Sequence, residues 1–143
     1  MTSLTLVRQI KARPSIVYEA FTRPDHLAQW LGPDAGPVLV AEADVRVGGR
    51  YRVRFRMLDG SEHESVGEYQ EVVPDHRLVF TWRWIGEGER DYESRVIVDL
   101  RPTADGTELT FTHDLLPDEA TADSHREGWG GSLDKLERLF EPA

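Results

Sequence analysis

The strongest constraint on the fold is a series of strand-like segments that ends in one long amphipathic segment. Between residues 36 and 115, apolar and polar side chains alternate in stretches separated by turn signals such as Asp59–Gly60. This period of two is typical of half-buried antiparallel strands. From about Asp118 to Phe140, apolar side chains instead recur every three or four residues, as on one face of a helix. We therefore expect about six antiparallel strands followed by one long helix.

The segment before these strands predicts one more strand and two short helices. Alternation from Leu4 to Lys11 indicates the strand. Pro14 suits the first turn of a helix, Pro24 ends that helix and starts another, and Pro33 ends the second. An antiparallel sheet with one apolar face must cover that face, and only the long helix is large enough to do so. The sequence therefore predicts an α+β fold, with either packed core or a cavity between sheet and helix.

Length and composition limit the classes of function. The 143 residues predict a single domain spanning residues 1–143. No stretch is long and apolar enough for a membrane span, the N-terminus does not resemble a signal peptide, and cysteine is absent, so we expect a cytoplasmic protein. The formal net charge of -9, from 26 acidic and 17 basic residues, argues against binding nucleic acid. No pair of histidines has the spacing of a helical metal site, so we expect no metal and no cofactor.

Three glycines surround a tryptophan in the long helical segment, where each glycine costs about 1 kcal/mol relative to alanine. They are Gly128, Gly130 and Gly131, beside Trp129. The glycines either allow the helix to pack closely on the sheet or leave room for a ligand beside the tryptophan. Both interpretations place the helix close to the sheet.

Candidates for acid–base chemistry are His113, Glu68 and Tyr51. His113 shares the inward parity of a neighbouring apolar strand face, where a hydrogen-bonded structural histidine is the simpler interpretation. Either face of the strand that carries Glu68 could point inward, and burial would raise the pKa of this carboxyl group. We favour an outward Glu68 beside the alternating arginines Arg50 to Arg56, which the nearby glutamates Glu62 and Glu64 could also pair with.

The sequence also bears on His125, Trp84 and His63. His125 could lie near His113 or point to solvent. Trp84 shares the strand face of Trp82 but lies at a strand end, where it could be exposed, and His63 is expected in a loop or on a polar face.

Five stretches in series carry a family resemblance that covers nearly the whole chain. They read "RPSIVYEAFTRPDHLAQWLGP", "GGRYRVRF", "VGEYQEVVPDHRLVFTW", "GTELTFTH" and "HREGWGGSLDKLERL". Together they resemble the SRPBCC, or START-like (Bet v 1-like), superfamily, and most nearly its Activator of Hsp90 ATPase homologue 1-like branch, which is related to CalC.

The resemblance implies a helix-grip fold, in which a curved antiparallel sheet wraps around a long C-terminal helix and encloses an apolar cavity. It implies that this cavity binds a hydrophobic or amphipathic small molecule. The side chains expected to line it are Phe21, Trp30, Tyr51, Val53, Phe55, Phe80, Trp82, Val96, Val98, Phe111, His113, Trp129 and Leu133.

Two other functions stay open. A polyketide cyclase-like or hydratase-like enzyme would use the same cavity for acid–base chemistry, although we expect binding without catalysis. A protein-interaction module, as in the co-chaperones of this family, would work through its outer surface. Activation of an Hsp90-type chaperone is not expected, because the co-chaperones carry a second domain for which this chain has no room. A homodimer is compatible with the sequence.

Overall fold

A computed structural model describes residues 2–86 and 92–141 of the protein. Within these residues, seven strands form one sheet in the order β1-β7-β6-β5-β4-β3-β2, and every neighbouring pair is antiparallel. The elements are β1 (Thr2–Ile10), α1 (Pro14–Thr22), α2 (Pro24–Trp30), β2 (Val38–Ala43), β3 (Arg50–Arg56), β4 (Glu62–Val73), β5 (Arg77–Trp84), β6 (Ser94–Thr103), β7 (Gly106–Leu116) and α3 (Glu119–Leu139). The predicted α+β helix-grip architecture is confirmed.

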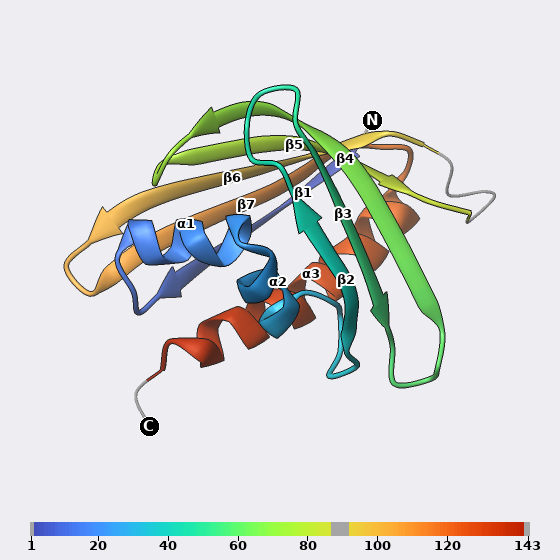
Figure 1. Ribbon diagram of the computed structural model, residues 1–143, viewed down its shortest axis with the longest axis horizontal. Coiled ribbons are helices and arrows are strands. Elements are labelled where there is room, and N and C mark those ends of the chain that lie inside the picture. The colour runs from blue at the N-terminus through green and yellow to red at the C-terminus, as the bar shows by residue number, and fades with distance from the viewer. Residues whose placement is uncertain (1, 87–91, 142–143) are drawn as a thin grey trace.

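The long helix α3 lies across the hollow face of the curved sheet (Figure 1). The residue before it, Asp118, caps the helix, because its side chain accepts a hydrogen bond of 2.8 Å from the backbone N–H of Thr121. Trp129, Leu133 and Leu136 are buried on its inner face, and the ring centre of Trp129 lies 4.4 Å from that of Phe111 on β7. This contact confirms the prediction that the last helix covers the apolar face of the sheet.

An inward-facing arginine on β1 ties this edge of the sheet to α3. Arg8 occupies a position whose parity otherwise carries apolar residues, and its guanidinium donates to Asp134 at 2.5 Å and to Glu137 at 3.2 Å. Because both acidic partners lie on α3, the inward charge is paired. The helix accordingly packs chiefly against β1.

The two short helices pack against each other, and α1 also contacts β6 and β7. Trp30 is almost wholly buried, its indole N–H donates to the carbonyl oxygen of Ala20 at 2.9 Å, and its ring meets Phe21 edge to face. Helix α2 contacts both the edge strand β2 and α3. This helix pair therefore helps to close the space between the two ends of the sheet.

Among the described residues, no helix is long and apolar enough to cross a membrane.

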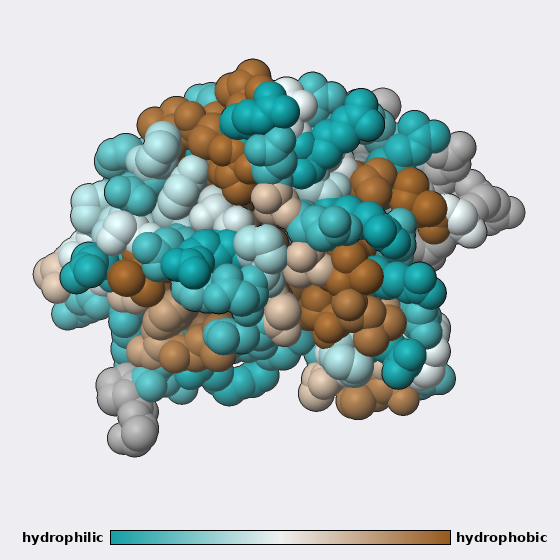
Figure 2. Space-filling model, in the orientation of Figure 1, coloured by the Kyte–Doolittle hydropathy of each residue, from teal (hydrophilic) through white to brown (hydrophobic). Residues whose placement is uncertain are grey.

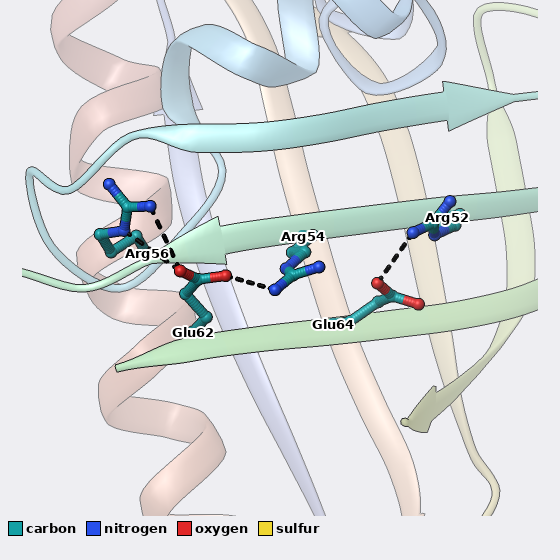
Figure 3. A network of polar contacts seen from close by, with 5 residues as sticks. All are labelled: Arg52, Arg54, Arg56, Glu62 and Glu64. Carbon is teal, nitrogen blue, oxygen red and sulfur yellow. Dashed lines mark hydrogen bonds and ion pairs between the residues drawn. The ribbon is translucent and has the colours of Figure 1, made fainter. Parts of the chain in front are cut away.

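The facing of β4, which the sequence left open, is decided by its burial pattern. Ser65 and Tyr69 are buried, whereas Glu68 is exposed. On the outer face, Arg52 pairs with Glu64 at 3.1 Å, while Arg54 and Arg56 both pair with Glu62 (Figure 3). The expected arginine–glutamate face between β3 and β4 is thus present, and Glu68 belongs to this outer side.

Near Gly67, side-chain hydrogen bonds complete the pairing between β4 and β5. The Tyr51 hydroxyl donates to the carbonyl oxygen of Thr81 at 2.9 Å, and the N–H of Glu68 donates to the Thr81 hydroxyl at 2.9 Å. A Cβ atom on Gly67 would lie only 2.3 Å from the Tyr51 ring and 1.9 Å from the Thr81 carbonyl oxygen. Gly67 is therefore required for Tyr51 to reach this part of the sheet.

Candidate ligand-binding site

A cavity of about 380 Å³ opens between α3, the strands β3 to β5 and the loop that follows α2. Its volume lies within the range of about 300–1,000 Å³ that is usual for small-molecule sites. Apolar and aromatic side chains form much of its wall, and several polar side chains lie among them. The apolar group is Leu31, Pro33, Phe55, Met57, Trp82, Trp84 and Trp129, and the polar group is Asp34, His63, Ser124, His125, Glu127 and Ser132.

The three glycines of α3 have different surroundings, so the two interpretations of the sequence apply to different positions. A Cβ atom on Gly128, which lines the cavity, would meet only Pro33 Cβ at 3.8 Å. A Cβ atom on Gly130 would lie 3.9 Å from Arg8 Nη2, which is an ordinary contact. On Gly131 it would lie 2.2 Å from the backbone oxygen of Pro33. Gly131 permits close packing, whereas Gly128 leaves space at the cavity.

The loop from Leu31 to Asp34 forms one wall and is held by hydrogen bonds to its backbone. Ser132 donates to the carbonyl oxygen of Gly32 at 2.8 Å, and the Lys135 ammonium donates to those of Leu31 and Asp34 at 3.2 and 2.6 Å. Partial burial lowers the pKa of Lys135, and the nearby carboxylate of Asp34 opposes that shift. Because both donor side chains, Ser132 and Lys135, lie on α3, the position of this wall depends on the helix.

The loop is also braced by the side chain of Asp34. Its carboxylate oxygens accept hydrogen bonds from the backbone N–H groups of Gly36 at 2.8 Å and Leu58 at 3.0 Å. Asp34 therefore links the cavity wall to the turn between β3 and β4.

His113 lies behind the cavity with both ring nitrogens engaged. Its Nδ1 accepts from the Trp129 indole N–H at 3.0 Å, which requires Nδ1 to be unprotonated because an indole can only donate. The neutral ring then carries its proton on Nε2 and donates to the Ser94 hydroxyl at 2.6 Å, while Ser94 donates to the Trp82 carbonyl oxygen at 3.1 Å. Burial, and then the neighbouring His125, lower the pKa of His113 well below its ordinary range. The chain fixes one tautomer and the position of Trp129.

Tyr51 and Glu68, the other two acid–base candidates, lie away from this cavity. The Tyr51 hydroxyl donates to Thr81, as described above, and lies 3.2 Å from the Ser65 hydroxyl. Burial raises the pKa of Tyr51 well above its ordinary value. Glu68 is exposed on the outer face. The structure therefore does not bring His113, Glu68 and Tyr51 together in one catalytic group.

Trp84 and His63 both form part of the cavity wall. Trp84 is only 8% exposed, and its ring packs on Phe55, His63 and His125 at centroid distances of about 6 Å. His63 shares the inward parity of Ser65 and Tyr69 on β4. Trp84 therefore extends the buried face of Trp82, which is one of the two positions left open for it. The expectation for His63 was wrong, because His63 lies in β4 on its inward face and lines the cavity.

His125 points inward, lines the cavity and packs against the His113 ring behind it. Its ring centre lies 4.5 Å from that of His113, and its Nε2 lies 2.9 Å from the hydroxyl of Tyr92. Of the two positions open in the sequence, the one near His113 is observed.

The residues expected to line the ligand site separate into three groups. Phe55, Trp82 and Trp129 line the 380 Å³ cavity. A second, interior space of about 30 Å³, with room for about one water molecule, is lined by Phe21, Trp30, Tyr51, Val53, Phe80, Trp82, Phe111 and Trp129. The others, Val96, Val98, Leu133 and His113, are at most 1% exposed and belong to the packed core.

One buried donor beside these spaces has no acceptor in the described part of the chain. It is the indole N–H of Trp82, a residue that is 4% exposed and borders both spaces. An unsatisfied buried donor costs about 1–3 kcal/mol, so a ligand oxygen or a water molecule that reached it would be stabilised.

Two cavity-lining serines of α3, Ser124 and Ser132, were not expected from the sequence, whereas Gly128 between them was. Ser124, Gly128 and Ser132 are spaced by four residues and form one stripe along the cavity. Apolar periodicity could not find this stripe, because its members are small or polar. Among residues 2–86 and 92–141, no group of three or more side chains could hold a metal ion.

The curved sheet that grips α3, with an aromatic cavity between them, defines a helix-grip protein of the α+β class. The family model described as "Activator of Hsp90 ATPase homolog 1-like protein" matches residues 11–141. The chain therefore belongs to the Activator of Hsp90 ATPase homolog 1-like family, which confirms the resemblance inferred from the sequence.

Solved structures agree with this assignment. Protein CV1439 from Chromobacterium violaceum is 33% identical with a TM-score of 0.89, over 99% of this chain and 98% of that one. The AHSA1 protein from Silicibacter pomeroyi is 27% identical with a TM-score of 0.84, over 96% of both chains. None of the curated proteins is significantly similar to the chain.

Proposed function

We propose that the protein binds a small apolar or amphipathic molecule in the 380 Å³ cavity between the sheet and α3 and leaves it chemically unchanged. The observation that carries this proposal is an aromatic-lined space of ligand size beside a helix position that lacks a side chain, Gly128. A wall of Phe55, Trp82, Trp84 and Trp129 favours transfer of apolar surface from water. Polar groups among these rings, including the Trp82 N–H nearby, favour an amphipathic ligand.

The contacts of the three acid–base candidates support binding over catalysis. His113 uses both ring nitrogens within the fold, Tyr51 uses its hydroxyl to complete the sheet, and Glu68 lies on the outer face. A general acid or base must reach the proton that it transfers. The second candidate function, a cyclase-like or hydratase-like enzyme, would instead depend on His63 and His125, which lie on the cavity wall.

A protein-interaction function would use the outer surface. The most exposed large apolar side chains, Leu58, Val47 and Val7, come from three different elements or turns. On the face in Figure 2, hydrophobic side chains form several groups with hydrophilic side chains between them. This distribution favours the cavity over an apolar interaction patch as the functional site.

Binding of the neutral fluorophore N-phenyl-1-naphthylamine tests the proposal. We expect saturable binding, with quenching of tryptophan fluorescence. Ser124→Phe, which places a ring on the exposed rim of the cavity, should weaken binding about tenfold or more. Arg126→Phe is the matched control, because Arg126 is exposed on the same helix and does not line the cavity. Equal loss in both variants, or no saturable binding by the parent, would contradict the proposal.

Native mass spectrometry of the purified protein separates binding from catalysis. A molecule carried through purification should leave the protein with its mass unchanged after prolonged incubation. A protein-dependent change in that mass would favour the enzyme instead.

A further inference from the structure

The charges around the cavity have one sign at its lining, although the chain carries many arginines. The charged side chains that line the cavity are the carboxylates Asp34 and Glu127, and no lysine or arginine of the described residues joins them there. The arginines of β3 point to the opposite side of the sheet, where Arg52, Arg54 and Arg56 are paired with glutamates (Figure 3). Side chains alternate between the two faces of a strand, so the sheet separates these charges from the cavity.

Asp34 and Lys135, the charged side chains that hold the loop wall, already form hydrogen bonds within the protein. The Asp34 carboxylate accepts from two backbone N–H groups, and the Lys135 ammonium donates to two carbonyl oxygens of the same loop. These opposite charges lie on one wall and largely offset each other. Glu127 is different, because it is exposed on α3, lines the cavity and has no hydrogen bond or ion pair among the described residues.

We propose that the cavity selects cationic apolar molecules over anionic ones of the same shape, with Glu127 as the specificity-determining residue at its rim. The inference rests on the proposed binding function and names the class of ligand: an aromatic or aliphatic body that carries an ammonium group. The aromatic walls act in the same direction, since the faces of tryptophan and phenylalanine rings attract cations. A carboxylate ligand would face Glu127, and among residues 2–86 and 92–141 no lysine or arginine on the lining would receive it.

One unit charge at about 4 Å in water changes binding by a factor of about five. Glu127 attracts the cation and repels the anion, so the two factors multiply, and we expect the cavity to prefer a cation over its matched anion by up to about twenty-fivefold at low salt. Replacing Glu127 by glutamine, which preserves the shape of the side chain, should bring the two affinities close to parity.

The test uses displacement of N-phenyl-1-naphthylamine by 1-naphthylmethylammonium and by 1-naphthoate. The experiment is run at about pH 8, where 1-naphthylmethylammonium carries a positive charge and 1-naphthoate a negative one. Asp123→Asn is the matched control, because Asp123 is exposed on the same helix but does not line the cavity. The expected result is a cation preference in the parent and in Asp123→Asn that is lost in Glu127→Gln.

Three results would overturn the inference while leaving the binding function intact. They are equal or tighter binding of naphthoate by the parent, a preference that survives in Glu127→Gln, and equal loss of preference in Asp123→Asn. The last would assign the effect to the general negative field of the protein. Failure of the neutral fluorophore itself to bind would instead contradict the proposed function. Thermal melts of both variants establish that they are folded.

Discussion

Replacing each of the three glycines of α3 by alanine should give three distinct results. All three positions are helical and none has a positive φ, so alanine gains about 1 kcal/mol of helix propensity at each. The added methyl groups meet different surroundings: the cavity at Gly128, the end of the Arg8 side chain at Gly130, and the backbone of Pro33 at Gly131. The balance between propensity and contact therefore differs along a single turn of helix.

The magnitude follows from the distances. At 2.2 Å from a carbonyl oxygen, a methyl group on residue 131 requires movement of the loop that hydrogen bonds from Ser132 and Lys135 hold in place. Overpacking of this kind costs up to about 3 kcal/mol, so Gly131→Ala should lose about 2 kcal/mol net. With about 3–4 °C per kcal/mol, that is a fall of roughly 6–8 °C in Tm. Gly128→Ala and Gly130→Ala should each raise Tm by about 3 °C.

Thermal melts combined with the fluorophore titration measure both effects. Gly128→Ala should weaken fluorophore binding, because its methyl group enters the cavity, whereas Gly130→Ala should bind like the parent. The second variant is thus the control for the helix-propensity gain. A substantial fall in Tm for both variants would refute the interpretation of Gly128 as a residue that leaves cavity space. An unchanged Tm for Gly131→Ala would refute the close-packing role of that glycine.

Three further predictions concern polar groups of the fold. Because the pKa of His113 is lowered in the folded state, protonation favours the unfolded chain, and stability should fall as pH decreases below about 6.5, by up to about 1.4 kcal/mol per pH unit for this one group. Urea unfolding at several pH values should show a shallower fall in His113→Gln. Tyr51→Phe leaves the Thr81 carbonyl oxygen without this donor and should cost about 1–3 kcal/mol in urea unfolding, with little change in fluorophore affinity. Lys135→Met should lower both stability and fluorophore affinity, because it releases the loop wall at Leu31 and Asp34.

The periodicity of apolar residues predicted the architecture because the strands and α3 each bury one face. Apolar and charged residues alternate strictly in β3, and apolar residues recur every three or four positions in α3. Both patterns match the side chains that are buried. The same information failed on β4, where Ser65, Gly67 and His63 point inward and carry no apolar signal. It also failed for Ser124 and Ser132, although the glycine between them, Gly128, was singled out from the sequence as a position that could leave room for a ligand. Ligand cavities are least visible in sequence where small or polar residues line them.

The residue types also did not reveal the contacts that His113 and Gly67 make in the fold. His113 was correctly expected on the inward face, but its partners Trp129 and Ser94 come from the two neighbouring elements α3 and β6, and their approach depends on how these elements pack. Gly67 serves a close approach of Tyr51 that depends on three strands at once. Such contacts depend on the register between strands, which a single strand pattern does not specify.

The cavity wall combines parts that the fold requires with parts that it does not. Trp129 and Trp82 are fixed through the His113–Ser94 chain, so changing either would also disturb the buried polar groups behind it. The loop wall is held at its backbone carbonyl oxygens by Ser132 and Lys135 and is braced by the Asp34 carboxylate. At the rim, Ser124 and Glu127 are exposed and can be replaced without leaving a buried group unpaired. Selection among ligands can therefore change at the rim of α3 while the rings behind it, and the stability that they supply, remain the same.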